Sequence, residues 1–199
     1  MRTVGLLGGV ASGKSYVAGL FCRLGAALLD ADGAGHEVLR EPEVESAARR
    51  RWGGEVFGPD GRIDRSRLAG IVFAAAPDGP RELEYLEQLT HPRIEDLLRR
   101  QASELEAAGR QVAVLDAPVM LKAGWDAFCD ILVFVDAPRE VRLARARGRG
   151  WTEDEFAARE AAQESLEAKR QRADMVIDNS GSPEATQAQL ERCWHAIVG

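Results

Sequence analysis

One glycine-rich segment limits what this chain can fold into more than any other feature. Residues 8–15 follow the spacing G-x-x-x-x-G-K-S, between an apolar run (3–7) and a helical pattern (13–24). Strand, loop and helix is the context that this spacing requires. Such a loop directs backbone N–H groups and a helix N-terminus at phosphate oxygens. The segment predicts a nucleoside triphosphate site, with Lys14 on the β- and γ-phosphates and Ser15 on Mg²⁺.

Four further apolar runs, at 26–29, 112–115, 131–135 and 175–177, are bounded by polar turns and separated by helical patterns. Strands that do not alternate between apolar and polar residues are typical of a parallel sheet covered on both faces. The pattern predicts an α/β doubly wound core.

Two long segments separate the predicted strands. The first has candidate helices at 36–51, 65–75, 80–89 and 93–108, divided by glycine and proline breaks. The second runs from Arg139 to Arg172, where the spacing of Thr152 and Glu155 predicts a capping box that opens a long helix. Both segments are too long for simple crossovers, so they predict insertions into the core.

The composition of the chain argues against several classes of binding partner. The formal net charge is -6, from 26 basic and 32 acidic side chains, and such a charge repels polyanions. The longest apolar runs are too short to cross a bilayer. Three widely spaced cysteines without a Cys-x-x-Cys pair fit neither a disulfide framework nor a zinc site. We therefore expect a cytoplasmic protein with no nucleic-acid or membrane partner.

A GTPase switch is disfavoured. Such a protein needs a base-reading Asn-Lys-x-Asp sequence, and the sole asparagine, Asn179, is followed by Ser180 and Gly181. The phosphate-binding loop must therefore serve another class of protein.

Acidic residues follow two of the predicted strands. Asp30 and Asp32 come after the second strand, where either one is a candidate general base or a capping residue. Asp116 ends the third strand and is a candidate magnesium ligand or a turn residue. Because ligands gather at the carboxyl edge of such a sheet, these carboxylates are site candidates.

Arginines crowd one stretch of this acidic chain. Arg142, Arg145 and Arg149 are spaced three and four residues apart and would share a helix face. They predict either a lid that closes on phosphate or a solvated helix face. His91, before Pro92, is predicted at a helix start, as a structural or a ligand-contacting residue.

Together these features resemble the dephospho-coenzyme A kinase family over nearly the whole chain. The matching pieces are residues 7–15, 29–32 with His36, 57–58, 61–65 with Leu68, 72–73, 89–94, 116–118, 124–125, Gln163 and 173–181. The resemblance implies a three-layer doubly wound parallel sheet of P-loop kinase type with a helical acceptor domain and a lid.

The resemblance also implies the reaction. Members transfer the γ-phosphoryl group of ATP to the ribose 3′-hydroxyl of dephospho-coenzyme A, with Mg²⁺. On that pattern, residues 1–32, 111–138 and 173–199 would form a nucleotide-binding core, 33–110 an acceptor-binding insertion and 139–172 an Arg-rich lid. We expect a small-molecule substrate and a monomer or weak homo-oligomer.

The resemblance assigns roles residue by residue. Asp32 would activate the acceptor, His36 and His91 would line the acceptor side, and Lys14 and Arg145 would act in catalysis. Asp116 and Ser15 would hold the metal. The residues expected to bind ATP are Gly9, Ala11, Ser12, Gly13, Lys14, Ser15, Tyr16, Arg142 and Arg149.

Two positions depart from the family pattern. Tyr16 replaces a threonine, and Lys122 stands at the end of a run that commonly ends in glutamate. Two alternatives remain open at this point: a P-loop kinase of another small hydroxylated metabolite, and a non-catalytic nucleotide-binding regulator.

Overall fold

The computed structural model describes residues 1–199 and divides into two compact units, residues 1–29 with 101–199, and residues 30–100. The first unit holds one parallel sheet with strand order β2-β3-β1-β4-β5. Its strands are β1 (Arg2–Gly8), β2 (Ala27–Leu29), β3 (Val112–Asp116), β4 (Ile131–Asp136) and β5 (Met175–Asp178). All five predicted strands are confirmed.

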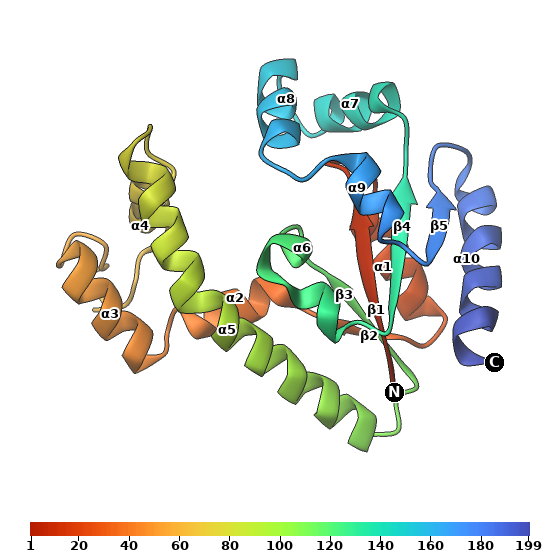
Figure 1. Cartoon of the computed structure of the whole chain (residues 1–199), viewed down its shortest axis with the longest axis horizontal. Helices are drawn as coiled ribbons and strands as arrows, with labels where there is room; N and C mark the ends of the chain where they lie inside the picture. Colours follow the sequence, from red (N-terminus) through yellow and green to blue (C-terminus); the bar gives the residue numbers. More distant parts are fainter. The chain divides into compact units, whose positions relative to one another are not determined.

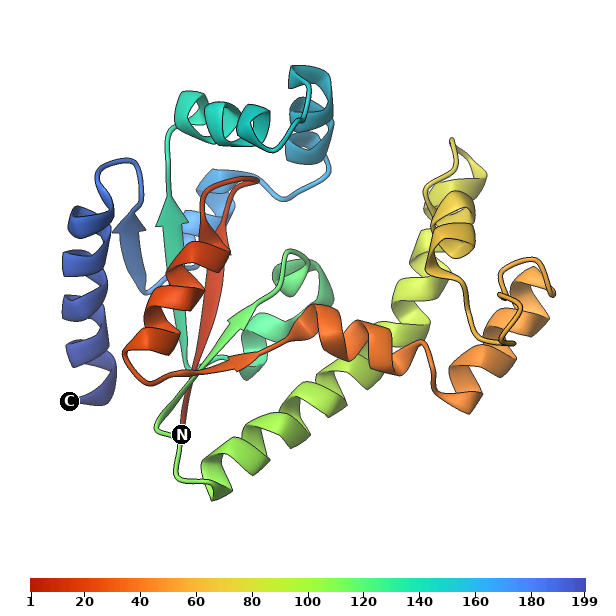
Figure 2. The same cartoon turned by 180° about the vertical axis from the view of Figure 1, so that it is seen from behind.

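Helices cover both faces of this sheet, as predicted for a doubly wound core (Figures 1 and 2). Side chains of α1 and α10, such as Phe21 and Leu190, join Val4 and Val133 of the strands in one buried cluster. The helices of the first unit are α1 (Lys14–Arg23), α6 (Met120–Ala123), the 3-10 helix η1 (Trp125–Phe128), α7 (Arg139–Gly148), α8 (Glu153–Ala161), α9 (Leu166–Gln171) and α10 (Pro183–Val198).

The strand register fixes where a site can form. β1 lies between β3 and β4, with Leu6 beside Asp116 and Gly8 beside Val135. The chain winds away from β1 in both directions, so the carboxyl end of β1 is the switch point where open α/β sheets bind ligands. The glycine-rich loop begins there.

The second unit is helical and has its own core. Its helices are α2 (Ala31–Val38), α3 (Pro42–Trp52), α4 (Arg65–Val72) and most of α5 (Asp78–Ala107). Phe57, Leu68 and Val72 are buried together, and Arg51 of α3 donates to Glu82 of α5 at 2.7 Å. Glu82 also accepts from Trp52 Nε1 at 2.8 Å. These contacts hold α3 against α5.

The helix predicted at 36–51 is wrong, because two helices replace it. α2 ends at Val38 and α3 begins at Pro42. The residue before a proline is pushed out of the helical region, and Glu41 is extended, with φ -66 and ψ 135. Pro42 is therefore a first-turn residue rather than an interior one.

The helix start predicted at His91 is also wrong. The segments 80–89 and 93–108 belong to the single helix α5, and Pro92 lies inside it. Arg93 donates to the Leu89 carbonyl at 2.6 Å and Thr90 Oγ1 to the Leu86 carbonyl at 2.8 Å. Side-chain groups thus donate hydrogen bonds to carbonyl groups of the helix close to the position where proline lacks a backbone N–H.

The capping box at Thr152 and Glu155 is confirmed, but the long helix is not. α8 ends at Ala161, and the Ser165 side chain accepts from Ala168 N to cap a separate helix, α9. A serine at such a position competes with the helix backbone and starts a new helix. The link between α8 and α9 bears on the site described below.

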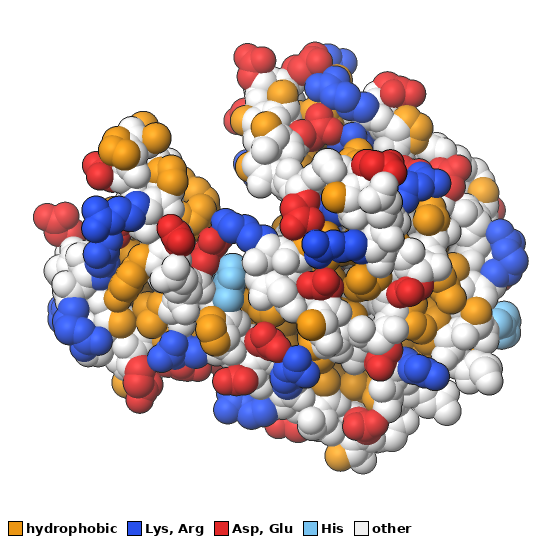
Figure 3. All heavy atoms as spheres, in the orientation of Figure 1, with side chains coloured by type: hydrophobic (Ala, Val, Ile, Leu, Met, Phe, Trp, Pro, Cys, Tyr) orange, Lys and Arg blue, Asp and Glu red, His pale blue; other side chains and the backbone are white.

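Charged side chains of both signs are interspersed over the face drawn in Figure 3. None of the helices combines the length and the apolar character that a membrane-spanning helix needs. Cys22, Cys129 and Cys193 are not disulfide-bonded.

Candidate nucleotide-binding site

The loop between β1 and α1 has the backbone of an anion cradle. Ala11 (φ 58) and Gly13 (φ 98) are both left-handed. Alternation of right- and left-handed residues turns successive N–H groups toward one point. Gly13 is the N-cap of α1 and supplies no side-chain cap, so the first N–H groups of α1 are available to an anion.

The glycines of this loop are sterically required. A Cβ atom on Gly8 would lie 2.6 Å from Ser12 Oγ and 2.7 Å from the Val135 carbonyl oxygen. A Cβ atom on Gly13 would lie 2.2 Å from Asn179 Nδ2. The Ser12 hydroxyl is buried without a hydrogen-bond partner in the protein, which fits a loop whose polar groups bind a ligand.

The loop is held in place by Asn179, which follows β5, and by Arg145 of α7. Asn179 Nδ2 donates to the Ser12 carbonyl at 2.8 Å, and Arg145 donates to the carbonyls of Ser12 (2.9 Å) and Asn179 (2.6 Å). The Thr186 hydroxyl donates to Asn179 Oδ1 at 3.1 Å. The Ser12 carbonyl is thereby occupied, and the Ser12 N–H donates to the Gly9 carbonyl at 3.2 Å, so the other N–H groups of the loop are the ones that can face an anion.

Arg142 braces the other end of the loop. Its guanidinium is 3% exposed and donates to the Val10 and Ala137 carbonyls at 3.3 and 3.0 Å. It also forms an ion pair of 2.6 Å with Glu160 of α8. Arg149 lies just past α7 and is exposed, so Arg142 and Arg149 do not share one surface face.

Lys14, Ser15 and Asp116 meet at the start of α1. Ser15 Oγ donates to Asp116 Oδ2 at 2.7 Å. Burial lowers the pKa of Lys14; Asp116 opposes this shift and the positive charge of Arg149 adds to it. Tyr16, the next residue, is 41% exposed.

The pair of Ser15 and Asp116 fits a magnesium ion. Mg²⁺ prefers oxygen ligands and in kinase sites takes one or two of them from the protein, the rest from phosphates and water. No group of three or more His, Cys, Asp or Glu residues is placed to hold a metal. A magnesium ion held by Ser15 and Asp116 would therefore take its remaining ligands from the nucleotide and water.

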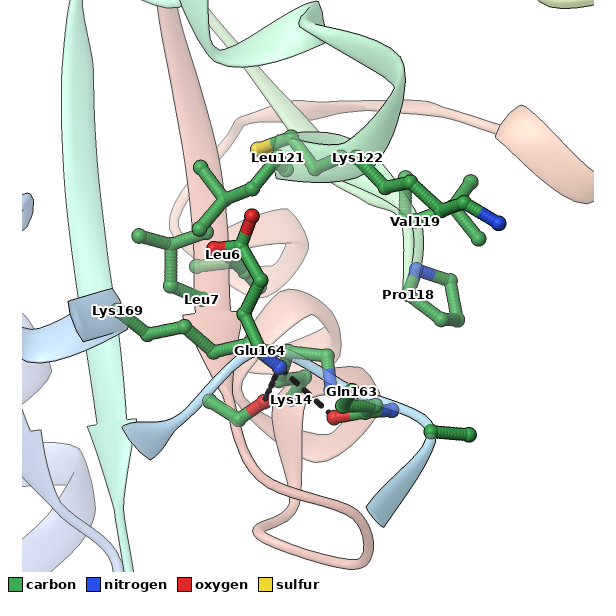
Figure 4. Close-up of a pocket in the computed structure, with 14 residues that line it drawn as sticks. Leu6, Leu7, Lys14, Pro118, Val119, Leu121, Lys122, Gln163, Glu164 and Lys169 are labelled. Atoms are coloured by element: carbon green, nitrogen blue, oxygen red, sulfur yellow. Dashed lines mark hydrogen bonds between the residues drawn. The ribbon is translucent and has the colours of Figure 1, made fainter. Parts of the chain in front are cut away.

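A pocket of about 190 Å³ opens beside the loop and brings together all three lysines of the chain, Lys14, Lys122 and Lys169. Figure 4 shows Lys169 extending from α9 toward the loop, next to Gln163 of the α8–α9 link. The sequence did not single out Lys169 or Asn179 for this site. Lysine and asparagine are rare in this chain, and this rarity could have marked both residues as candidates for the site.

The predicted acceptor residues lie in the helical unit. Asp32 and His36 are exposed and one turn apart on α2, so they share a face. Asp30 is a capping residue, which accepts from Gly33 N at 2.9 Å. His36 contacts the Arg65 guanidinium, and His91 is half-buried in α5. The loop, Asp116, Arg142 and Arg145 thus belong to one unit, and Asp32, His36 and His91 to the other.

The chain is similar to known kinases along its length. A family model described as dephospho-CoA kinase matches residues 2–184. A protein named dephospho-CoA kinase from Symbiobacterium thermophilum is 40% identical over 201 residues, which cover 100% of this chain and 82% of that protein. One with the same name from Anaeromyxobacter dehalogenans is 39% identical over 204 residues, covering 100% and 93%.

Solved structures agree on the fold. A Thermus thermophilus protein matches with a TM-score of 0.82 at 34% identity, covering 100% of this chain and 98% of that one. The dephospho-CoA kinase from Campylobacter jejuni matches with a TM-score of 0.66 at 21% identity, covering 99% and 97%. Shikimate kinase from Acinetobacter baumannii, at 15% identity and a TM-score of 0.51, covers 99% and 93% and shares the fold alone. The predicted three-layer fold of P-loop kinase type is confirmed.

Proposed function

Because the chain belongs to the dephospho-CoA kinase family, we infer that it transfers the γ-phosphoryl group of ATP to the ribose 3′-hydroxyl of dephospho-CoA, giving CoA and ADP. The observation that carries this inference is an intact phosphate cradle in a chain that the family model matches over residues 2–184. Neither the other-metabolite kinase nor the non-catalytic regulator has an observation in its favour.

ATP binding rests on the loop geometry. The N–H groups of Gly9, Ala11 and Gly13, with those of Lys14, Ser15 and Tyr16, would surround the phosphates, and Ser12, whose N–H donates to the Gly9 carbonyl at 3.2 Å, would complete the loop. Lys14 would hold the β- and γ-phosphates, and Ser15 and Asp116 would hold Mg²⁺. When bound, Mg²⁺ neutralises charge that develops on the phosphates.

Asp32 is our candidate for the acceptor-activating base. Its carboxylate is exposed on the first turn of α2, whereas that of Asp30 is engaged in capping. A positioned carboxylate that takes the proton from the attacking hydroxyl contributes about 10²–10⁴-fold. We place His36 and His91 on the acceptor side, with His36 on the same helix face as Asp32.

Arg142, Arg145 and Arg149 have different proposed roles. We propose that Arg142 acts through the loop that it supports, and that Arg145 and Arg149 stabilise the charge of the transferring group. Arg145 lies against the Ser12 carbonyl at 2.9 Å, and Arg149 is close enough to Lys14 to lower its pKa. Catalysis is then mainly positioning and electrostatics.

The remaining expectations extend this proposal. Residues 139–172, which carry the arginines, would serve as the lid, residues 33–110 as the acceptor-binding part, and the three segments 1–32, 111–138 and 173–199 as the nucleotide-binding core. We propose a cytoplasmic enzyme that acts on a small molecule as a monomer or weak homo-oligomer, without nucleic-acid or membrane partners.

The test is an acceptor panel. ADP release is measured with dephospho-CoA, nucleoside monophosphates, shikimate and gluconate, for the wild type and for Lys14→Met. We expect ADP release with dephospho-CoA alone, and its loss in the variant. Release with another acceptor instead would identify a different kinase, and tight ATP binding without release would identify a regulator.

A further inference from the structure

Two cations of the first unit are buried, and they differ in how they are neutralised. Arg142 (3% exposed) forms an ion pair with the Glu160 carboxylate. Lys169 (5% exposed) has only neutral partners, the Gln163 side-chain oxygen at 2.8 Å and the Gly8 carbonyl at 3.4 Å. A buried charge without a counter-charge costs several kcal/mol, so its presence needs a reason.

The surroundings of Lys169 add positive charge. Burial, together with the charges of Lys14 and Arg142, lowers the pKa of Lys169 to about 8, and Glu164 opposes this shift. Glu164 is exposed and forms no hydrogen bond or ion pair with the lysine. Lys14 and Lys169 line the same pocket, which therefore carries excess positive charge.

The position of Lys169 relates this charge to the phosphate loop. Gly8, whose carbonyl accepts from Lys169, is the first residue of the loop and the last of β1. Figure 4 shows the Lys169 side chain lying along this end of β1, with dashed lines to the Gly8 and Gln163 oxygens. The ammonium thus lies where the loop opens into the pocket.

We propose that Lys169 is a second phosphate-binding lysine, whose ammonium joins that of Lys14 in holding the phosphoryl group that is transferred. This inference rests on the proposed kinase function and adds to it a residue from α9. The γ-phosphate supplies the anion that the protein does not. Lys169 then contacts the reacting group, and Gln163, which accepts from its ammonium, is a positioning residue.

The chemistry follows from charge. During transfer, negative charge is spread over the oxygens of the phosphoryl group, and a fixed ammonium in a dry site stabilises it. A hydrogen bond to a charged group is worth about 1.5–3 kcal/mol, or roughly 10- to 150-fold in affinity. ADP lacks the group that Lys169 contacts, so the effect is confined to the triphosphate.

The experiment compares Lys169→Met with a matched control, Arg170→Met. Both variants remove one cation from α9, but Arg170 is exposed and pairs with Asp136 at 2.5 Å. Titration with AMP-PNP and with ADP, each with Mg²⁺, gives affinities that do not depend on an acceptor. Turnover is then measured with dephospho-CoA, and unfolding without nucleotide gives the melting temperature.

For Lys169→Met we expect about 10- to 100-fold weaker AMP-PNP binding, ADP binding within about 3-fold of wild type, and kcat lowered about 100-fold. Its melting temperature without ligand should equal or exceed that of wild type, because an unpaired buried cation has been removed. Lys169→Arg, which keeps the charge, should recover part of kcat. Arg170→Met should match wild type in turnover and in both affinities.

A second variant tests the same charge from the other side. Gln163→Glu gives Lys169 a carboxylate partner within the fold, so the γ-phosphate must compete for the ammonium. AMP-PNP should bind more weakly and ADP should be unaffected, as in Lys169→Met, while stability without nucleotide should rise.

The proposal is overturned if Lys169→Met weakens ADP and AMP-PNP equally, if it weakens neither, or if it melts earlier with kcat unchanged. The last result would make Lys169 a structural brace between α9 and β1. Failure of the kinase assignment would look different, because wild type would then release no ADP with dephospho-CoA while the affinity comparison still reports on Lys169.

Discussion

The two compact units present their predicted site residues in opposite ways. In the sheet unit the phosphate loop is held by left-handed residues and by buried donors such as Asn179 and Arg142. In the helical unit, Asp32 and His36 are exposed on the surface of α2. The comparison teaches that the sheet unit fixes the geometry of its candidate residues through buried contacts, whereas the helical unit presents its candidates on an exposed helix.

The largest effect is expected from a substitution that distorts the glycine-rich loop of the sheet unit. Gly13→Ala forces a Cβ atom to 2.2 Å from Asn179 Nδ2 at a backbone φ of 98, so the loop must move. A displacement of about 1 Å costs about 100-fold in rate, and we expect a loss of about this size in ATP affinity by calorimetry. Gly19→Ala, in α1 with nothing within 4 Å, is the control and should bind ATP normally. Normal ATP binding by Gly13→Ala would show that the loop is not rigid.

The next effect tests the exposed half. Asp32→Asn should lower kcat about 100-fold or more and leave ATP affinity unchanged, because it removes the proposed base and leaves the loop intact. Steady-state kinetics and ATP titration measure the two quantities. Asp30→Asn is the matched control, since asparagine also caps helices and activity should persist. Full activity in Asp32→Asn would remove this residue from the mechanism.

Much of this contrast was visible in the sequence. The motif of residues 8–15 predicted the loop and its strand–helix context, and apolar runs predicted every strand. The brace from Asn179 to Ser12 was not predictable from spacing, because 167 residues separate the two. Pro42 was a sequence signal for the break between α2 and α3, because a proline favours an extended residue before it, here Glu41. Pro92 gave the same signal but lies inside α5, where side-chain hydrogen bonds that the sequence does not show surround it.

The pH dependence of the unfolding free energy tests whether the sheet unit carries a buried charge without a counter-charge at Lys169. The pKa of Lys169 is about 8 in the folded protein, against 10.5 as its ordinary value. Between these values the unfolded chain binds more protons, so the stability of wild type relative to Lys169→Met should rise with pH. We expect a change of the order of 1–3 kcal/mol between pH 7 and 9.5 in urea unfolding without nucleotide.

Lys14, Arg142 and Glu164, which face Lys169, are unchanged in that comparison and cancel from the difference to a first approximation. A stability difference that stays constant with pH would show that Lys169 is not desolvated as the structure indicates.

The smallest effect concerns backbone strain in the loop. Ala11 has φ 58, a conformation that disfavours residues with a Cβ atom. Ala11→Gly relieves this strain but removes a methyl group that is buried beside Leu143 and Phe156, so its unfolding free energy in urea should stay within about 0.5 kcal/mol of wild type. Ala158→Gly, in the exposed interior of α8, has no strain to relieve and should destabilise the fold by about 0.5–1 kcal/mol. Equal destabilisation in both variants would mean that Ala11 carries no strain.

The most direct test of the central claim locates the phosphate. Purified protein is incubated with Mg²⁺, ATP and dephospho-CoA, and the product is examined by mass spectrometry and phosphorus NMR. The structure and family membership predict one CoA per ADP, with the new phosphate on the ribose 3′-oxygen. ADP formed without a phosphorylated acceptor, or a phosphate at another hydroxyl, would contradict the account.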